Sequence, residues 1–184
     1  LQYGRPKFAL EGFAYLAARD KDDTALKALV HELGDSVSAR NALVVRARDE
    51  DSSITHEEVL EKAFPCAGDL ENTVGWANLM NNTGRYLYAR AADKRDIAAA
   101  LGFFSIAKFA YGTEKNWHHR AALQYWVSHT LEQLGLIAAA INAASESQYC
   151  WQRQVEVDPG NAEYRTRLQG AQKRVCELLQ KRQR

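Results

Sequence analysis

Two pairs of histidine and glutamate residues have the spacing of metal ligands on a helix. Glu114 lies one helical turn before His118, and His129 lies one turn before Glu132, so each pair shares a helix face. Di-iron sites in helical bundles need a Glu-x-x-His pair on each of two helices and two further glutamates. Here the second pair has the reverse order, and no further glutamates are well placed. We therefore expect these side chains to be structural or on the surface, with a helical metal-dependent enzyme around His118 and His129 as an alternative.

The remaining reactive side chains form no catalytic motif. Cys66, Cys150 and Cys176 are far apart and lack CxxC spacing, which argues against a zinc or redox site. The chain contains no phosphate-binding loop, no Gly-x-Gly-x-x-Gly and no Gly-x-Ser-x-Gly. We expect neither an enzyme nor a cofactor. Unpaired thiols are typical of a cytoplasmic protein.

Length and charge exclude further classes. The 184 residues predict a single domain over 1–184. No apolar run approaches the roughly 20 residues that span a bilayer, so we expect no membrane segment. The net charge of +1 indicates no strong overall field that would attract nucleic acid. Because the chain starts at Leu1 rather than methionine, we expect it to be a piece of a longer protein.

Hydrogen-bonding side chains gather on one face of a predicted helix over 69–92. Asn78, Asn82 and Arg85 recur at i, i+4 and i+7, and Asn81 stands beside them. Amide and guanidinium groups on a shared face can bind a ligand. The alternative is that the asparagines only weaken the helix, because asparagine favours caps and turns.

Helices must position these side chains, because the chain is rich in alanine and has three prolines and few β-branched runs. We predict an all-α fold of consecutive antiparallel hairpins with a final capping helix. The predicted hairpins cover 6–34, 36–66, 69–112 and 117–158, and the capping helix covers 162–180. In the last hairpin we expect helices over 117–141 and 144–157.

Several residues predict where helices begin and end. Thr55 with Glu58 forms the pattern of a capping box, and Asp69 and Asn161 are candidate N-caps. Gly34 and Gly112 follow helical patterns and are predicted to end them. These signals depend only on residues that are close in the sequence.

Four glycines lie inside helical patterns, namely Gly12, Gly84, Gly102 and Gly135. Each costs about 1 kcal/mol relative to alanine. We expect a neighbouring helix to approach closely and offset this cost.

Aromatic residues at helical spacing are predicted to be part of the core. They are Phe103, Phe104, Phe109, Trp126, Tyr149 and Trp151.

The stretch over 128–161 resembles a tetratricopeptide repeat, whose period is about 34 residues. Leu131, Leu134 and Gly135 match the large, apolar and small positions of its first helix. Trp151, Val155 and Val157 match core positions of its second helix, and Asp158-Pro159 closes it. The match is looser over 76–112 and before residue 66. The resemblance implies a right-handed stack of helical hairpins, an α-solenoid, with a solvated cap.

The resemblance also implies a function, because such repeats bind proteins or peptides along an inner groove. Under it, we expect the module to be a scaffold or sensor segment of a larger regulatory protein. The residues that it places on the groove are Asn78, Asn81, Asn82 and Arg85 in one unit, and His129, Glu132 and Gln133 in another. The other alternative is an RNA-binding helical repeat, because residues 93–184 carry 13 basic and 9 acidic groups.

Overall fold

Helices make up all the regular structure in the computed structural model, which describes residues 7–63, 73–112 and 117–183. No strand occurs in these ranges, which confirms the predicted all-α class. The helices are α1 (Lys7–Arg19), α2 (Asp23–Leu33), α3 (Val37–Arg46), α4 (His56–Ala63), α5 (Thr73–Ala89), α6 (Lys94–Tyr111), α7 (Trp117–Gln133), α8 (Ile137–Val157) and α9 (Ala162–Arg182).

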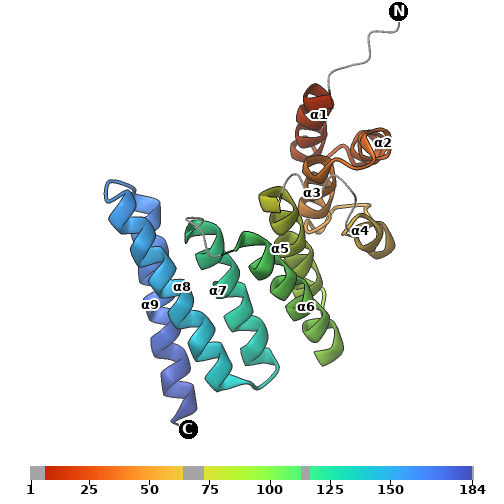
Figure 1. Cartoon of the computed structure of the whole chain (residues 1–184). Coiled ribbons are helices and arrows are strands. Elements are labelled where there is room, and N and C mark those ends of the chain that lie inside the picture. Colours follow the sequence, from red (N-terminus) through yellow and green to blue (C-terminus); the bar gives the residue numbers. More distant parts are fainter. Residues whose placement is uncertain (1–6, 64–72, 113–116, 184) are drawn as a thin grey trace, which may run out of the picture.

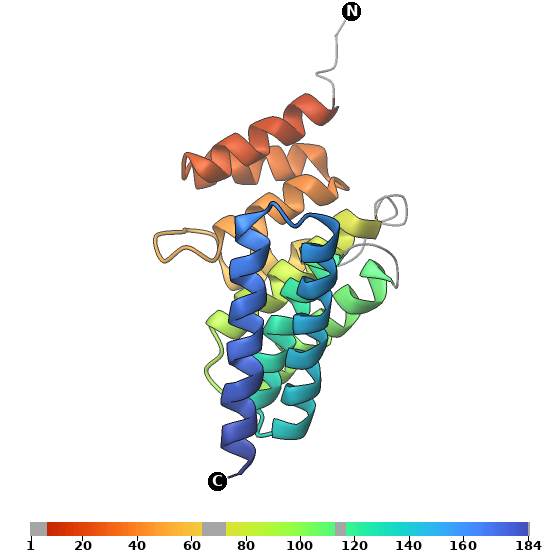
Figure 2. The ribbon, with the colours of Figure 1, turned by 90° about the vertical axis from the view of Figure 1, so that its left-hand side faces the viewer.

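Helices that are neighbours in the chain are also neighbours in space (Figure 1). The most extensive contacts join α5 to α6 and α7 to α8, and α8 also packs along α9. A second series of contacts joins α1 to α3 and α3 to α5. Figure 2 shows α8 and α9 side by side in blue, and Figure 1 shows them on the opposite side of the molecule from α1 and α2. The molecule is therefore elongated, and α1 and α9 lie at its two ends.

The buried apolar residues within the described ranges form one large cluster and two small ones. The large cluster draws on α1 to α7 and includes Leu26, Leu79 and Phe104. The small clusters join α7 or α8 to α9, through Trp151 with Ala171 and through Ala140 with Leu178. The last helix is thus held by an apolar stripe that also includes the partly buried Tyr164, Leu168 and Val175, and polar contacts add to this attachment.

The predicted aromatic core is only partly correct. Phe104 is completely buried, and Trp151 is 8% exposed. Phe109 is 85% exposed and Tyr149 is 54% exposed, because each stands on an outer face of its helix. Val157, a predicted core position, is 71% exposed at the end of α8. Helical spacing identifies a face, but it does not identify which helix covers that face.

The local signals for helix ends are confirmed where they can be followed. Thr55 Oγ1 accepts from the Glu58 amide at 3.2 Å, and Glu58 Oε2 accepts from the Thr55 amide at 2.7 Å. Asn161 Oδ1 accepts from the amides of the second and third residues after it. Gly34 and Gly112 end α2 and α6 with positive φ angles of 49° and 63°. The predicted cap Asp69 lies outside the described residues.

The prediction that Gly135 packs inside a helix is wrong. Its φ angle is +82°, and it lies in the turn between α7 and α8. The Leu136 amide donates to the Leu131 carbonyl at 2.9 Å, a bond typical of helices that end at glycine. The expected helices over 117–141 and 144–157 are therefore corrected to Trp117–Gln133 and Ile137–Val157.

Among the other three glycines, close helix packing occurs at Gly84. A Cβ atom there would lie 2.6 Å from Phe104 Cε1 and 3.1 Å from the Ala100 carbonyl oxygen. At Gly12 and Gly102 a Cβ atom would meet no atom within 4 Å. The missing side chain of Gly84 thus lets α5 and α6 approach each other.

Replacing Gly84 with leucine is expected to destabilise the fold by about 1–3 kcal/mol, through overpacking against Phe104. Gly84→Ala should cost less than Gly84→Leu, because the clash grows with side-chain size. At Gly135, replacement with alanine or with leucine should lower the free energy of unfolding by similar amounts, because any side chain is strained at a φ angle of +82°. Gly102→Leu is the matched control and should be neutral or stabilising. Urea unfolding measures all of them, and equal losses for Gly84→Leu and Gly102→Leu would contradict the packing explanation.

Candidate functional site

A groove of about 680 Å³ lies between α5, α7, α8 and α9, and we call it the α5–α9 groove. Its walls include Arg85 from α5, His118, His119, Tyr125 and Trp126 from α7, Trp151 from α8, and Glu163, Arg167 and Gly170 from α9. These side chains meet because successive helices place their exposed faces side by side. A groove of this size with aromatic walls and a few polar groups is suited to bind a ligand.

Arg85 is the residue on the groove wall that the sequence identified. Its guanidinium lies over the Trp126 ring, 5.0 Å from the ring centroid, and Nη1 donates to Asn82 Oδ1 at 3.5 Å. Nε is buried without a hydrogen-bond partner. Burial, together with the charges of Arg48 and Arg167, lowers the pKa of Arg85 to about 10. Arg85 therefore stays charged at neutral pH, and no carboxylate among the described residues forms an ion pair with it.

The three predicted asparagines are not on the groove wall. Asn78 Oδ1 accepts from the Tyr111 hydroxyl at 2.6 Å, which ties α5 to α6. Asn82 Nδ2 donates to Asn41 Oδ1 at 2.8 Å, which ties α5 to α3. Asn81 is 8% exposed. Asn78 and Asn82 thus contact neighbouring helices, and a role of the three asparagines in binding a ligand stays a prediction.

The second predicted set, on α7, also has other roles. Glu132 forms ion pairs with Arg174 and Lys181 of α9, and these charges hold its pKa below the usual value despite burial. His129 packs beside Tyr125, with ring centroids 4.6 Å apart, and burial lowers its pKa. Gln133 is exposed at the end of α7. None of the three lies on the wall of the α5–α9 groove.

Sequence reasoning missed most of the groove. Helical spacing predicts a core position for Trp126, and no sequence motif singles out Tyr125, Arg167 or Gly170 as a binding residue. A usable signal existed in α7, where Ala122, Tyr125 and Trp126 share one face at i, i+3 and i+4. The missing information was that α5 and α9 lie on either side of this face.

The histidine pairs form no metal centre in the part of the chain that the structure describes. No group of at least three His, Cys, Asp or Glu side chains there is placed to hold a metal ion. His118 and His129 lie on one helix, where their separation in sequence corresponds to about 16 Å along the axis. The ring centroids of His118 and His119 are 3.8 Å apart. Burial, together with the charge of His118, lowers the pKa of His119 to about 4. Glu114 lies outside the described residues.

The basic groups of α9 are mostly engaged within the protein. Arg174 is buried, with an exposed fraction of 6%. Lys181 pairs with Glu132, Arg167 with Glu163, and Lys173 with Glu177. Several of these pairs are exposed, so they are weak, and the cations of this helix remain accessible to a ligand.

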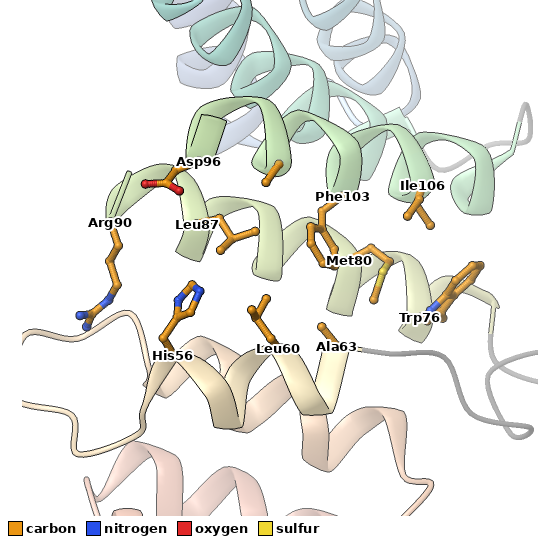
Figure 3. A pocket seen from close by; sticks show the side chains of 11 residues that line it. His56, Leu60, Ala63, Trp76, Met80, Leu87, Arg90, Asp96, Phe103 and Ile106 are labelled. Atoms are coloured by element: carbon orange, nitrogen blue, oxygen red, sulfur yellow. The ribbon is translucent and has the colours of Figure 1, made fainter. Parts of the chain in front are cut away.

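A second concavity, of about 710 Å³, lies over α5 with α4 and α6 as its walls (Figure 3). Leu60, Met80, Phe103 and other apolar side chains line most of it, while His56, Arg90 and Asp96 stand at one end. Arg90 Nη2 donates to the Ala47 carbonyl at 3.0 Å, and Asp96 Oδ2 accepts from the Ala92 amide at 2.8 Å. These two charged groups already have partners, which distinguishes this trough from the α5–α9 groove.

No described helix combines the length and the apolar character needed to cross a lipid bilayer. Comparison with known proteins gave no match to any protein-family model, curated protein or solved structure.

Proposed function

We propose that this chain is a protein- or peptide-binding module, built as a right-handed stack of helical hairpins similar to tetratricopeptide repeats. The proposed hairpins are α1–α2, α3–α4, α5–α6 and α7–α8, with α9 as the cap. The order of helix contacts supports the stack, because α1, α3 and α5 contact one another in series and α9 follows α8. The hairpin from Trp117 to Val157 exceeds the family's period of about 34 residues, so the proposal rests on the contacts and not on the repeat register.

The α5–α9 groove is the observation that carries the binding role. The helices α5, α7, α8 and α9 line it with aromatic rings and two guanidinium groups, and Tyr125 remains 36% exposed there. Tyrosine, tryptophan and arginine are the residues that contribute most to binding in protein interfaces. A segment of a partner protein that lies in the groove would cover these side chains.

The same proposal includes that the module belongs to a larger regulatory protein and that this protein is cytoplasmic. A module that binds and does not catalyse suits a scaffold or sensor segment of a larger regulatory protein. Cys150 and Cys176 are both free thiols, and free thiols persist in a reducing compartment such as the cytoplasm.

Replacing Gly170 with leucine is expected to block the groove without harming the fold. A Cβ atom at Gly170 would meet no atom within 4 Å, and leucine favours a helix over glycine by up to about 1 kcal/mol. Peptides selected on the wild-type chain from a random library should therefore bind the Gly170→Leu variant roughly 10-fold or more weakly, at an equal or higher melting temperature. Fluorescence polarisation with labelled peptides measures the affinity.

Gly102→Leu on α6 is the matched control for this experiment. Gly102 is also helical, a Cβ atom there also meets open space, and the residue is not on the groove wall. Its peptide affinity should equal that of the wild type. Unchanged affinity in the Gly170→Leu variant would show that the selected peptides bind elsewhere.

A further inference from the structure

Arg85 is a cation in a partly enclosed groove, and it has no counter-ion among the residues that the structure describes. The charged groups that act on it most strongly are Arg48 and Arg167, both of which are also cations. Burial lowers the pKa of Arg48 as well. A charge that leaves water without a counter-ion is costly, and an arginine remains protonated at neutral pH. An anion in the groove would remove this cost, and planar guanidinium groups bind carboxylates and phosphates with two hydrogen bonds.

Arg167 can act as a second cation toward the same anion. Its Nη2 atom is 3.3 Å from Glu163 Oε1, and these two side chains are 61% and 68% exposed. An ion pair this exposed contributes little free energy, so a ligand can compete for Arg167. Glu163 is the one carboxylate among the described residues of the groove wall.

The groove also has an apolar part that a small anion would leave empty. Ala122, Gly170 and Ala171 supply small side chains, while Trp151 and Tyr125 supply large rings. The open space at Gly170 is next to Ala171, which packs against Trp151. A bulky apolar side chain fits such a slot, and an aromatic one would bury roughly 150–250 Å² of its surface.

We infer that the partner segment presents an anionic group to Arg85 and Arg167 together with a bulky apolar side chain for the slot at Gly170. This inference rests on the proposed binding of a peptide in the groove, and it specifies the chemistry of that peptide. The anion is the carboxylate of an acidic residue or the phosphate of a modified one. A protein segment is favoured over RNA, because the net charge of the chain is +1, which gives no strong overall field that would attract a nucleic acid.

The test uses the full chain and four sets of fluorescein-labelled peptides in a Gly/Ser background. The sets carry glutamate with phenylalanine, glutamine with phenylalanine, glutamate with alanine, and phosphoserine with phenylalanine, each at several spacings. The glutamate–phenylalanine or the phosphoserine–phenylalanine set should bind roughly 10- to 100-fold more tightly than the glutamine set. The better of the two identifies the source of the anion. The glutamate–alanine set should bind more weakly than the glutamate–phenylalanine set by a similar factor, because it lacks the bulky side chain.

Two variants and a salt titration link this preference to the groove. Arg85→Gln should remove the preference for an anion, so that the glutamate and glutamine peptides bind with similar affinities. Arg153→Gln is the control, because Arg153 is exposed on α8 in a pair with Glu156. If Arg85→Gln does not fold, the salt titration of the wild type replaces it, and the affinity for anionic peptides should fall as salt rises.

The outcomes separate this inference from the proposed function. Peptides that bind, lose affinity on Gly170→Leu and show no preference for an anion would overturn the inference alone. Failure of every peptide, from these sets and from the random library, would overturn both. Tight binding of single-stranded RNA that is lost on Gly170→Leu would assign the groove to nucleic acid and overturn the peptide chemistry.

Discussion

Replacing Arg46 with alanine is expected to lower the free energy of unfolding by about 3–5 kcal/mol. The Arg46 side chain is 2% exposed, and its Nε atom lies 2.8 Å from Asp23 Oδ1. Its Nη1 atom donates to Asp51 Oδ1 at 2.7 Å and to Asp49 Oδ2 at 3.1 Å. Without the guanidinium, the nearly buried Asp23 carboxylate keeps its Ser53 amide bond but loses its counter-ion. Urea unfolding followed by circular dichroism measures the loss.

An exposed ion pair on the same chain provides the control. Arg153 pairs with Glu156, and these side chains are 48% and 46% exposed, so Arg153→Ala should cost less than about 1 kcal/mol. Similar losses for the two alanine variants would contradict the special role of Arg46.

Acid should reduce the difference between the wild type and Arg46→Ala. Hydrogen bonds from Lys21 and Arg46 lower the pKa of Asp51 to about 2. Burial raises the pKa of Asp23, but the Ser53 bonds and the Arg46 charge outweigh it and hold this pKa below its usual value. A carboxylate with a lowered folded-state pKa stabilises the fold above its unfolded pKa of about 4, and this contribution is lost as pH falls toward the folded value. The difference in free energy of unfolding between the two proteins should therefore narrow from about pH 4 to about pH 2. A constant difference would show that the carboxylates of Asp23 and Asp51 are not the reason why Arg46 stabilises the fold.

Replacing Arg174 with alanine is expected to release α9 from α7, at a cost of about 2–4 kcal/mol. Arg174 donates through Nε to Ser128 Oγ at 3.2 Å, and through Nη2 to the Ser128 carbonyl at 3.3 Å and to Glu132 Oε2 at 2.6 Å. Lys181 still pairs with Glu132 in the variant, so the loss should be smaller than for an uncompensated charge. The apolar residues of α9 stay packed against α7 and α8 in the variant, so the loss should be smaller than for complete detachment of the helix.

Hydrogen exchange distinguishes local release from a general loss of stability. Amides of α9 should exchange faster in Arg174→Ala, while those of α3 and α5 should keep most of their protection. Lys173→Ala is the control on the same helix. The Lys173 side chain is 77% exposed, and its Nζ atom is as far as 3.9 Å from Glu177 Oε1, so this ion pair is weak. Faster exchange throughout the chain, with no excess in α9, would mean that α9 is not a separate unit.

The sequence predicts the all-α class, the number of helices and most helix ends in the described ranges. These features depend on residues that are close to one another in the sequence. The capping pair of Thr55 and Glu58 spans one turn, and the bond pattern follows from residue types alone. Gly34 and Gly112 end their helices because glycine adopts positive φ at low cost. The same property misled the prediction at Gly135, where one glycine could either end a helix or allow a neighbour to approach.

The sequence by itself determined that the chain is helical, where α2, α4 and α6 end or begin, and that Arg85 is a candidate for binding. The tertiary structure alone decided that Gly84 faces Phe104 while Gly102 faces open space, although both are helical glycines. It also decided that Asn78 and Asn82 tie helices together, whereas Arg85 on the same face reaches the groove beside Trp126. The physical reason is that periodicity describes one helix, while burial and free charge depend on which other helices cover each part of its face.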